Sequence, residues 1–146
     1  MAGKVRSISL EEARQMIRAG ERRADEMGKE MNIAVVDARA KVIAFKRRDV
    51  AWIGSVDVAM NKASTARVID IATRAPGKKA QNGEDCRRIR VSSRGRVIIV
   101  AGGVPLKRGD QVVGAVGVSG GVGEEAQAVA EAVAKAFSDA SERKAA

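Results

Sequence analysis

One stretch decides the fold of this chain: it reads VIIVAGGVPL over residues 97–106, KRGD over 107–110 and QVVGAVGVSGG over 111–121. This pattern predicts an apolar strand, a rigid glycine–proline corner, a polar turn, and a second apolar strand that leaves through glycines into a helix. The glycines of the second strand have no Cβ, so another backbone or a ligand can approach them closely. Tight hairpin packing is the simpler interpretation of the same glycines.

The composition fits a single domain of 146 residues, with an ordered core over about residues 8–140. Hydrophobic residues make up 45 % of the chain but aromatic residues only 2 %, so we expect a core of Val, Ile, Ala, Leu and Met. No apolar run reaches the length of about 18 residues that a membrane span needs, and the first residues lack the apolar segment of a secretory signal. Cys86 is the only cysteine, which excludes an internal disulfide and makes a cytoplasmic location the default expectation.

The formal net charge is +9, which favours anionic partners such as phosphates, carboxylates or nucleic acid. Nucleic acid is the weaker expectation, because few aromatic rings are present to stack on bases and no recognition motif is visible. A partner bound through the basic segment between Arg74 and Arg96 would dissociate steeply as salt rises. The chain has no histidine and no tyrosine, which excludes imidazole catalysis and the common zinc sites.

Helical and strand periodicities alternate along the chain. Ser9 and Glu12 have the spacing of a capping box, and the apolar stripe that follows predicts a helix ending at Gly28. Short hairpins imply an antiparallel sheet, and helices with one apolar face must cover it, so we expect an α+β domain. The other predicted elements are strands over residues 31–36 and 41–45, a turn at 37–40, a helix beginning at Ser55 and a helix beginning near Gly123.

Short motifs occur along this chain in the order in which one known family has them, and the chain resembles the GlcG/HbpS-like proteins over roughly residues 8–137. This family includes the C-terminal domain of PduO-type adenosyltransferases. The resemblance implies a profilin-like fold, with a five-stranded antiparallel sheet flanked by helices in α/β/α layers, and assembly into homo-oligomers. It also implies that the protein accompanies the enzymes of small-acid and diol catabolism. The motifs are LEEA at 10–13, VVD at 35–37, RRDVA at 47–51, AMNKASTA at 59–66, GGVP at 102–105 and GVSGG at 117–121.

The chain departs from the family pattern at two places that matter for function. The hairpin that usually turns through Asp-x-Gly-Gly has Arg39 and Ala40 here, so we expect a different turn geometry. Some relatives bind heme through histidine, and this ligation cannot be carried over to a chain without histidine. Hydroxyl and thiol side chains are the alternatives for an iron ligand, and the candidates are Thr65, Ser92, Ser93 and Cys86.

The resemblance brings together a polar set formed by Arg47, Asp49 and Lys62. As a binding site, Arg47 would grip a carboxylate with two hydrogen bonds, and Lys62 would add a positive charge. As an enzyme site, Asp49 would be the base and Lys62 the acid. A salt-bridged junction between helix and loop is the structural alternative. Thr65 shares a helix face with Lys62 and would bind the same anion, or simply bond to its own backbone.

Three further segments are candidates for ligand contact, the third being the one with Arg87 and Arg88. Gly102 and Gly103 stand at the predicted corner, and Ser119, Gly120 and Gly121 precede a helix, where free N–H groups favour anions. Ordinary capping and tight packing are the alternatives there. Cys86 lies beside Arg87 and Arg88, and neighbouring cations lower the pKa of a thiol. The resulting thiolate could act as a nucleophile or an iron ligand, although an inert thiol is the simpler interpretation.

These patterns lead to one principal hypothesis and one alternative. The principal hypothesis is an oligomeric protein that binds a small anionic organic ligand, heme being the candidate that the resemblance implies. The alternative is an enzyme of small organic-acid catabolism, an isomerase, hydratase or lyase that works without histidine and uses Asp49, Lys62 and Cys86. We expect no metal site built from side chains alone, no membrane partner and no nucleic-acid partner.

Overall fold

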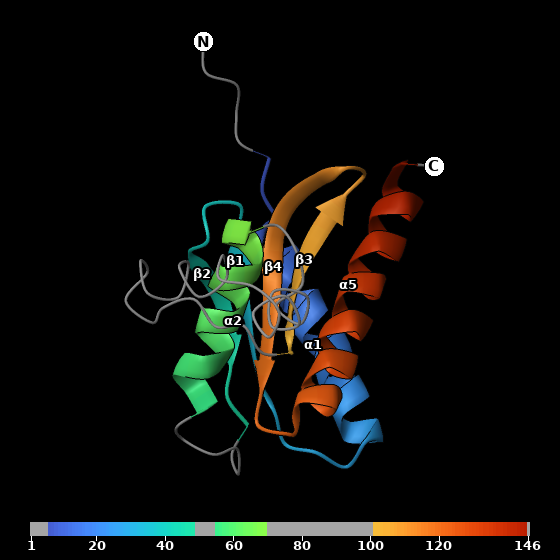
Figure 1. Ribbon diagram of the computed structural model, residues 1–146. Helices are drawn as coiled ribbons and strands as arrows, with labels where there is room; N and C mark the ends of the chain where they lie inside the picture. Colours follow the sequence, from blue (N-terminus) through green and yellow to red (C-terminus); the bar gives the residue numbers. More distant parts are fainter. Residues whose placement is uncertain (1–5, 49–54, 70–100, 146) are drawn as a thin grey trace, which may run out of the picture.

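The structure, a computed structural model, describes residues 6–48, 55–69 and 101–145. Within these ranges three helices and four strands form one α+β unit (Figure 1). The predicted helices, and the strands predicted over 31–36 and 41–45 and from residue 111, are present within a residue or two of their predicted starts. The elements are α1 (Leu10–Glu26), β1 (Asn32–Asp37), β2 (Val42–Lys46), α2 (Ser55–Ile69), β3 (Gly103–Arg108), β4 (Gln111–Ser119) and α5 (Gly123–Ala145).

The four strands form one antiparallel sheet in the order β2-β1-β4-β3. Val35 of β1 lies opposite Val116 of β4, which in turn lies opposite Val104 of β3. The predicted five strands are therefore wrong for the described residues, which form four. The central pair β1 and β4 is covered on both faces, and this explains why almost every residue of these two strands is buried.

The predicted glycine–proline corner is wrong for Gly103, Val104 and Pro105, which lie inside strand β3, whereas Gly102 bends the chain just before the strand with φ of 119°. Pro105 has no N–H to donate, but β3 is an edge of the described sheet and pairs only with β4, so the missing donor faces no second strand. The predicted polar turn over 107–110 is confirmed, because the chain turns at Gly109 and Asp110, where Gly109 adopts a positive φ of 64°. The apolar run over 97–100 lies outside the described residues.

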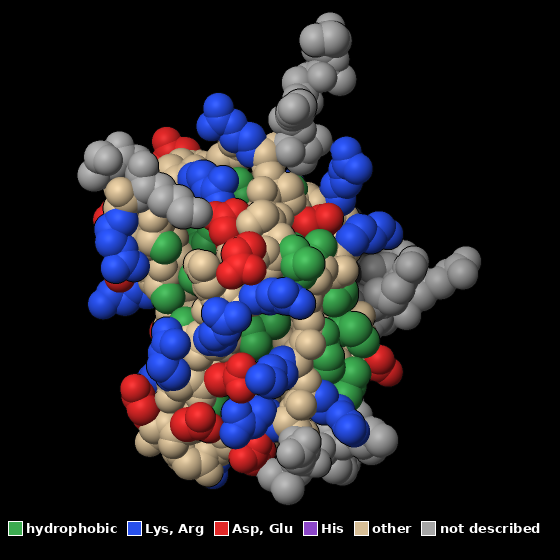
Figure 2. Space-filling view, turned by 180° about the vertical axis from the view of Figure 1, so that it is seen from behind, with side chains coloured by type: hydrophobic (Ala, Val, Ile, Leu, Met, Phe, Trp, Pro, Cys, Tyr) green, Lys and Arg blue, Asp and Glu red, His purple; other side chains and the backbone are tan. Residues whose placement is uncertain are grey.

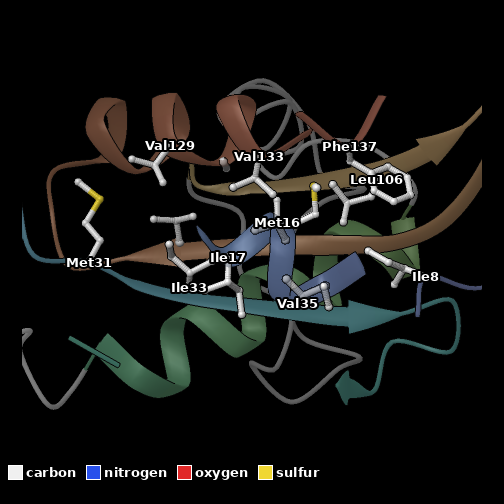
Figure 3. Close-up of a cluster of buried hydrophobic side chains, with 14 of the residues drawn as sticks. Ile8, Met16, Ile17, Met31, Ile33, Val35, Leu106, Val129, Val133 and Phe137 are labelled. Carbon is white, nitrogen blue, oxygen red and sulfur yellow. The ribbon is translucent and has the colours of Figure 1, made fainter. Parts of the chain in front are cut away.

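The helices cover the two faces of the sheet unequally, as Figure 1 shows: α1 and α5 lie on one face and α2 on the other. The predicted α/β/α layering is thus confirmed. On the α1/α5 face, Ile33 and Val35 of the sheet meet Ile17 of α1 and Val133 and Phe137 of α5 (Figure 3). This core is built mainly from Val, Ile, Leu and Met side chains, with one aromatic ring and four alanines, and burying each of the larger side chains is worth about 1.5–3 kcal/mol.

The α2 face has a different core, made almost entirely of small side chains. It contains Val36 and five alanines, and the short side chains let the backbone of α2 approach the sheet closely. The closest approach is at Gly117 of β4, where a Cβ would lie 2.0 Å from the carbonyl oxygen of Ala59. The five alanines are Ala34, Ala59, Ala63, Ala66 and Ala115, each with 0 % exposure.

The start of α1 follows the predicted capping box. The Ser9 hydroxyl accepts a hydrogen bond from the Glu12 N–H, and the Glu12 carboxylate accepts one from the Ser9 N–H. Gly28 ends the helix with φ of 67°, as predicted. Leu10, the first residue of the apolar stripe of α1, is 52 % exposed, because the buried face begins a turn later with Ala13 and Met16.

In the turn between β1 and β2, Arg39 and Ala40 stand where the family usually has two glycines. Ala40 has a φ of 63°, which a residue with a Cβ rarely adopts. The Asp37 carboxylate compensates by accepting hydrogen bonds from the N–H groups of Arg39, at 2.9 Å, and Lys41, at 3.0 Å.

None of the helices in the described ranges is long and apolar enough to cross a membrane.

Candidate functional site

The most unusual side chain on the α2 face is Lys62, whose residue is only 6 % exposed. Its Nζ donates a hydrogen bond to the Val118 carbonyl oxygen at 3.0 Å, and no carboxylate of the described residues forms an ion pair with it. Burial lowers the pKa of this amine from its ordinary value, because the charged form loses its hydration. An ammonium group held in this way has N–H donors left for an anionic oxygen.

Gly102 provides the space that this ammonium group occupies. A Cβ on Gly102 would lie 2.9 Å from Lys62 Nζ and 2.6 Å from the Val118 carbonyl oxygen. The residue also has φ of 119°, a conformation that side chains disfavour. The glycine is therefore required here both for its backbone conformation and for the lysine beside it, which gives the predicted ligand-binding residue Gly102 a place at the site.

The backbone of Gly102 is fixed from two sides. Its carbonyl oxygen accepts a hydrogen bond from the Val118 N–H at 2.8 Å, and its own N–H donates to Gln127 Oε1 at 2.9 Å. Gln127 is 3 % exposed and its Nε2 donates to Glu131 Oε1 at 2.9 Å. Sequence reasoning missed Gln127; its signal is a polar side chain in the buried stripe of α5, between Ala126 and Val129.

Thr65 and Ser119 are both buried at this junction, with exposures of 2 % and 3 %. Each takes part in a polar interaction within the protein. Thr65 and Lys62 do share the sheet-facing side of α2, as their spacing predicts. Gly103, the first residue of β3, is buried and lies opposite Gly117, so it belongs to the tightly packed strand pair.

The glycine-rich exit from β4 has its own internal partners. The N–H of Val122 donates to Glu125 Oε1 at 3.0 Å, and Lys29 Nζ lies 3.4 Å from Glu125 Oε2. A carboxylate of the chain thus takes the place near the start of α5 that an external anion would use. A Cβ on Gly120 would lie 2.8 Å from the Glu30 carbonyl oxygen, so this glycine is needed for packing, and Gly121 is exposed.

Of the predicted polar set, the structure describes Lys62 and Arg47 only. The Arg47 side chain is exposed and has no ion pair with the described residues, so it is not brought against Lys62 there. Asp49, Cys86, Arg87 and Arg88 lie outside the described residues, as do Ser92 and Ser93. Among the described residues no group of three acidic or cysteine side chains is arranged to hold a metal ion.

Arg48, which sequence analysis passed over, forms the ion-pair network instead. Its guanidinium lies 2.7 Å from a Glu30 oxygen and 3.1 Å from oxygens of Glu21 and of Asp25. The hydrogen bond from Arg48 lowers the pKa of the Glu30 carboxyl. The Arg48 N–H also donates to Asn32 Oδ1 at 3.3 Å, so this residue fixes the chain that leaves β2. Acidic residues four apart on α1 are the signal that would have pointed to such a partner.

This arrangement defines a small three-layer α+β domain with a buried cationic site between α2, β4 and the residue before β3. The chain belongs to the HbpS-like family: the family described as "Haem degrading protein HbpS-like" matches residues 8–135. The resemblance drawn from the sequence motifs is thereby confirmed.

Two sequence relatives come from Citrobacter freundii. One is an uncharacterised 15.0 kDa protein in the dhaT-dhaS intergenic region, 32 % identical over 92 % of this chain and 95 % of the relative. The other is the corrinoid adenosyltransferase PduO, 31 % identical over 86 % of this chain. The chain spans only 37 % of the length of PduO, so the likeness concerns one part of that protein.

Several solved structures share the fold. Klebsiella pneumoniae protein ORFY is 34 % identical, with a TM-score of 0.88 and coverage of 94 % of each chain. A PduOC:heme complex is 27 % identical, with a TM-score of 0.83 over 89 % of this chain and 94 % of that one. A double mutant of Streptomyces reticuli HbpS is 26 % identical, with a TM-score of 0.81 over 92 % and 90 % of the two chains.

Proposed function

We propose that this protein binds heme or a similar anionic organic molecule at the site around Lys62. The observation that carries the proposal is the buried Lys62 ammonium group, which the described residues supply with a backbone carbonyl and no carboxylate. A carboxylate of the ligand, such as a heme propionate, would complete that hydrogen bonding and remove the cost of burying a lone charge. The solved heme complex of a relative with the same fold supports the choice of ligand.

The described residues fit the acidic part of heme better than its iron. Lys62 would hold a propionate, and the space at Gly102 keeps the ammonium group in place. Heme supplies redox chemistry at its iron when bound. No histidine exists in the chain to ligate that iron, and Thr65 is buried and engaged in the protein, while Cys86 lies outside the described residues. Cys86 and Thr65 stay the candidates for the iron ligand.

Titration of the purified protein with hemin, followed through the Soret band, tests the proposal. We expect a saturable, shifted band that weakens in Lys62→Met and is unchanged in Lys135→Met, because Lys135 is an exposed lysine on α5. Cys86→Ala and Thr65→Ala identify an iron ligand if either variant abolishes the shift. A linear absorbance increase without saturation, or equal binding by the two lysine variants, would refute a heme site at Lys62.

The second candidate is an enzyme of organic-acid catabolism, and one observation favours it. Burial lowers the pKa of Lys62, and an amine tuned in this direction is suited to proton transfer. In this reading Arg47 would hold the substrate carboxylate and Asp49 would be the base. Thermal-shift screening of small carboxylates tests it, and Asp49→Asn with undiminished turnover would remove Asp49 from the role. Self-association, a profilin-like topology, a cytoplasmic location and a catabolic role stay predictions.

A further inference from the structure

A groove with a volume of about 380 Å³ lies between α1 and the edge strand β2, on the side of the sheet away from α2. Leu10, Arg14, Ile17, Arg18 and Glu21 of α1 form one wall, and residues 43–46 of β2 form the other. The volume is near the lower end of the range of about 300–1,000 Å³ for small-molecule sites. The groove is separate from Lys62, whose helix packs on the opposite face of the sheet.

The groove is elongated. Leu10 and Glu21 are eleven residues apart on α1, which corresponds to about 16 Å along a helix at about 1.5 Å per residue. The four strand residues span about 10 Å at about 3.4 Å per residue. A space that is long compared with its volume fits an extended chain better than a compact or planar molecule.

Two arginines on the helix wall lack the partners that their neighbours have. Lys46 pairs with Glu21 at 3.2 Å and Arg48 pairs with three carboxylates, whereas Arg14 and Arg18 form no ion pair with any described residue. Arg14 and Arg18 are four residues apart and lie on one side of α1, so their like charges repel. In the view from behind, many Lys and Arg side chains lie on this face among Asp and Glu side chains, with hydrophobic side chains between them (Figure 2). An anion placed between these arginines would relieve the repulsion.

The other end of the groove is apolar. Leu10 is 52 % exposed although it continues the apolar stripe of α1, and Ile43 across from it is only half-buried. The ion pair between Lys46 and Glu21 joins the end of β2 to the later part of α1, so Ile43 lies toward Leu10. Uncovered apolar surface at one end and unpaired positive charge further along are the two features that an amphipathic anion complements.

We infer that this groove binds a straight-chain carboxylate with an apolar tail, such as a medium-chain fatty acid. The carboxylate lies between the guanidinium groups of Arg14 and Arg18, which donate charge-assisted hydrogen bonds to it. The tail extends along the groove toward Leu10 and Ile43 and covers them. This site does not depend on the function proposed for Lys62.

Isothermal titration with sodium octanoate tests the inference, with octan-1-ol as the uncharged control. We expect saturable octanoate binding that weakens at least about tenfold in Arg14→Gln/Arg18→Gln, because two charge-assisted hydrogen bonds are lost. Both arginines are exposed, so circular dichroism should show that this variant folds like the parent. Arg22→Gln is the matched control, since Arg22 is an exposed arginine of α1 that does not line the groove.

Three outcomes would overturn the inference. The first is absence of saturable octanoate binding to the parent protein. The second is an equal loss of affinity in Arg22→Gln, which would indicate unspecific attraction to a basic surface. The third is loss of octanoate binding in Lys62→Met, which would place the anion at the other site. Failure of hemin to bind leaves this test unaffected, so the two proposals fail separately. Backbone amide shifts at residues 43–46 on adding octanoate would support the location directly.

Discussion

Gly117→Ala provides the sharpest test of how α2 is positioned over the sheet. The added Cβ would lie 2.0 Å from the Ala59 carbonyl oxygen and 2.5 Å from the Ala63 N–H nitrogen. Both obstacles are backbone atoms of one helix, so no side chain can rotate away. To reach an ordinary contact of 3.4 Å, α2 must retreat by about 1.4 Å. Overpacking of a core costs about 1–3 kcal/mol. A clash with two backbone atoms, which cannot move aside as a side chain can, belongs at the upper end of that range.

We therefore expect Gly117→Ala to lower the free energy of unfolding by about 3 kcal/mol. For a chain of this length such a loss corresponds to a fall in Tm of about 6–12 °C. Urea unfolding followed by circular dichroism measures it, with Gly123→Ala as the control. A Cβ on Gly123 would meet only the Ala101 Cβ, at 3.7 Å, so that variant should stay within about 0.5 kcal/mol of the parent. If the two alanine variants were equally stable, the close approach of α2 to β4 would be refuted.

Three other substitutions have outcomes that follow from single contacts. Ala40→Gly should raise the free energy of unfolding by about 0.5–1 kcal/mol, because glycine adopts φ of 63° without strain; unchanged urea unfolding would contradict this. Arg48→Met should return the pKa of the Glu30 carboxyl toward its usual value in a carbon-13 NMR titration. The variant should also lack the stability that this carboxyl gives the parent above its usual pKa, which the parent loses as pH falls through the lowered pKa. An unshifted Glu30 pKa would show that the ion pair is absent in solution. The stability of the parent should rise with pH, because the folded protein releases the Lys62 proton at a lower pH than the unfolded chain, which keeps it up to the ordinary pKa of 10.5. Lys62→Met should abolish this rise. Urea unfolding between neutral pH and that value measures this rise, and a flat profile in the parent would contradict a desolvated ammonium group.

Local patterns predicted most of the helical and hairpin structure of this chain. The capping box at Ser9 and Glu12 and the glycine at position 28 mark α1, because both ends of a helix have unsatisfied backbone groups that these residues satisfy. The apolar stripe of α5 likewise predicted its buried face, including Val133 and Phe137. These signals work at short range, since the residues that decide the structure are only a few positions apart.

The errors arose where partners far apart in the sequence decide the outcome. Pro105 resembles a corner residue until its pairing with β4, at the edge of the described sheet, is known. The place of Lys62 depends on Gly102 and Gln127, which lie 40 and 65 residues later, and no local pattern connects either of them to Lys62. Arg48 was passed over in favour of Arg47 because neighbouring arginines look alike in a sequence. Only the fold shows which of the two reaches the carboxylates of Glu21 and Glu30.

The two unequal cores have a consequence for how the molecule opens. A buried methyl group contributes about 0.8 kcal/mol. The burial of alanines therefore stabilises the packing of α2 much less than the burial of Ile17, Val133 and Phe137 stabilises that of α1 and α5. We expect native-state hydrogen exchange to show α2 detaching as a separate unit, at a lower free energy than β1 and β4, whose amides would exchange only on global unfolding. The element that carries Lys62 would then be the one that most readily lifts away, giving a bulky molecule a way in and out without unfolding the rest of the chain.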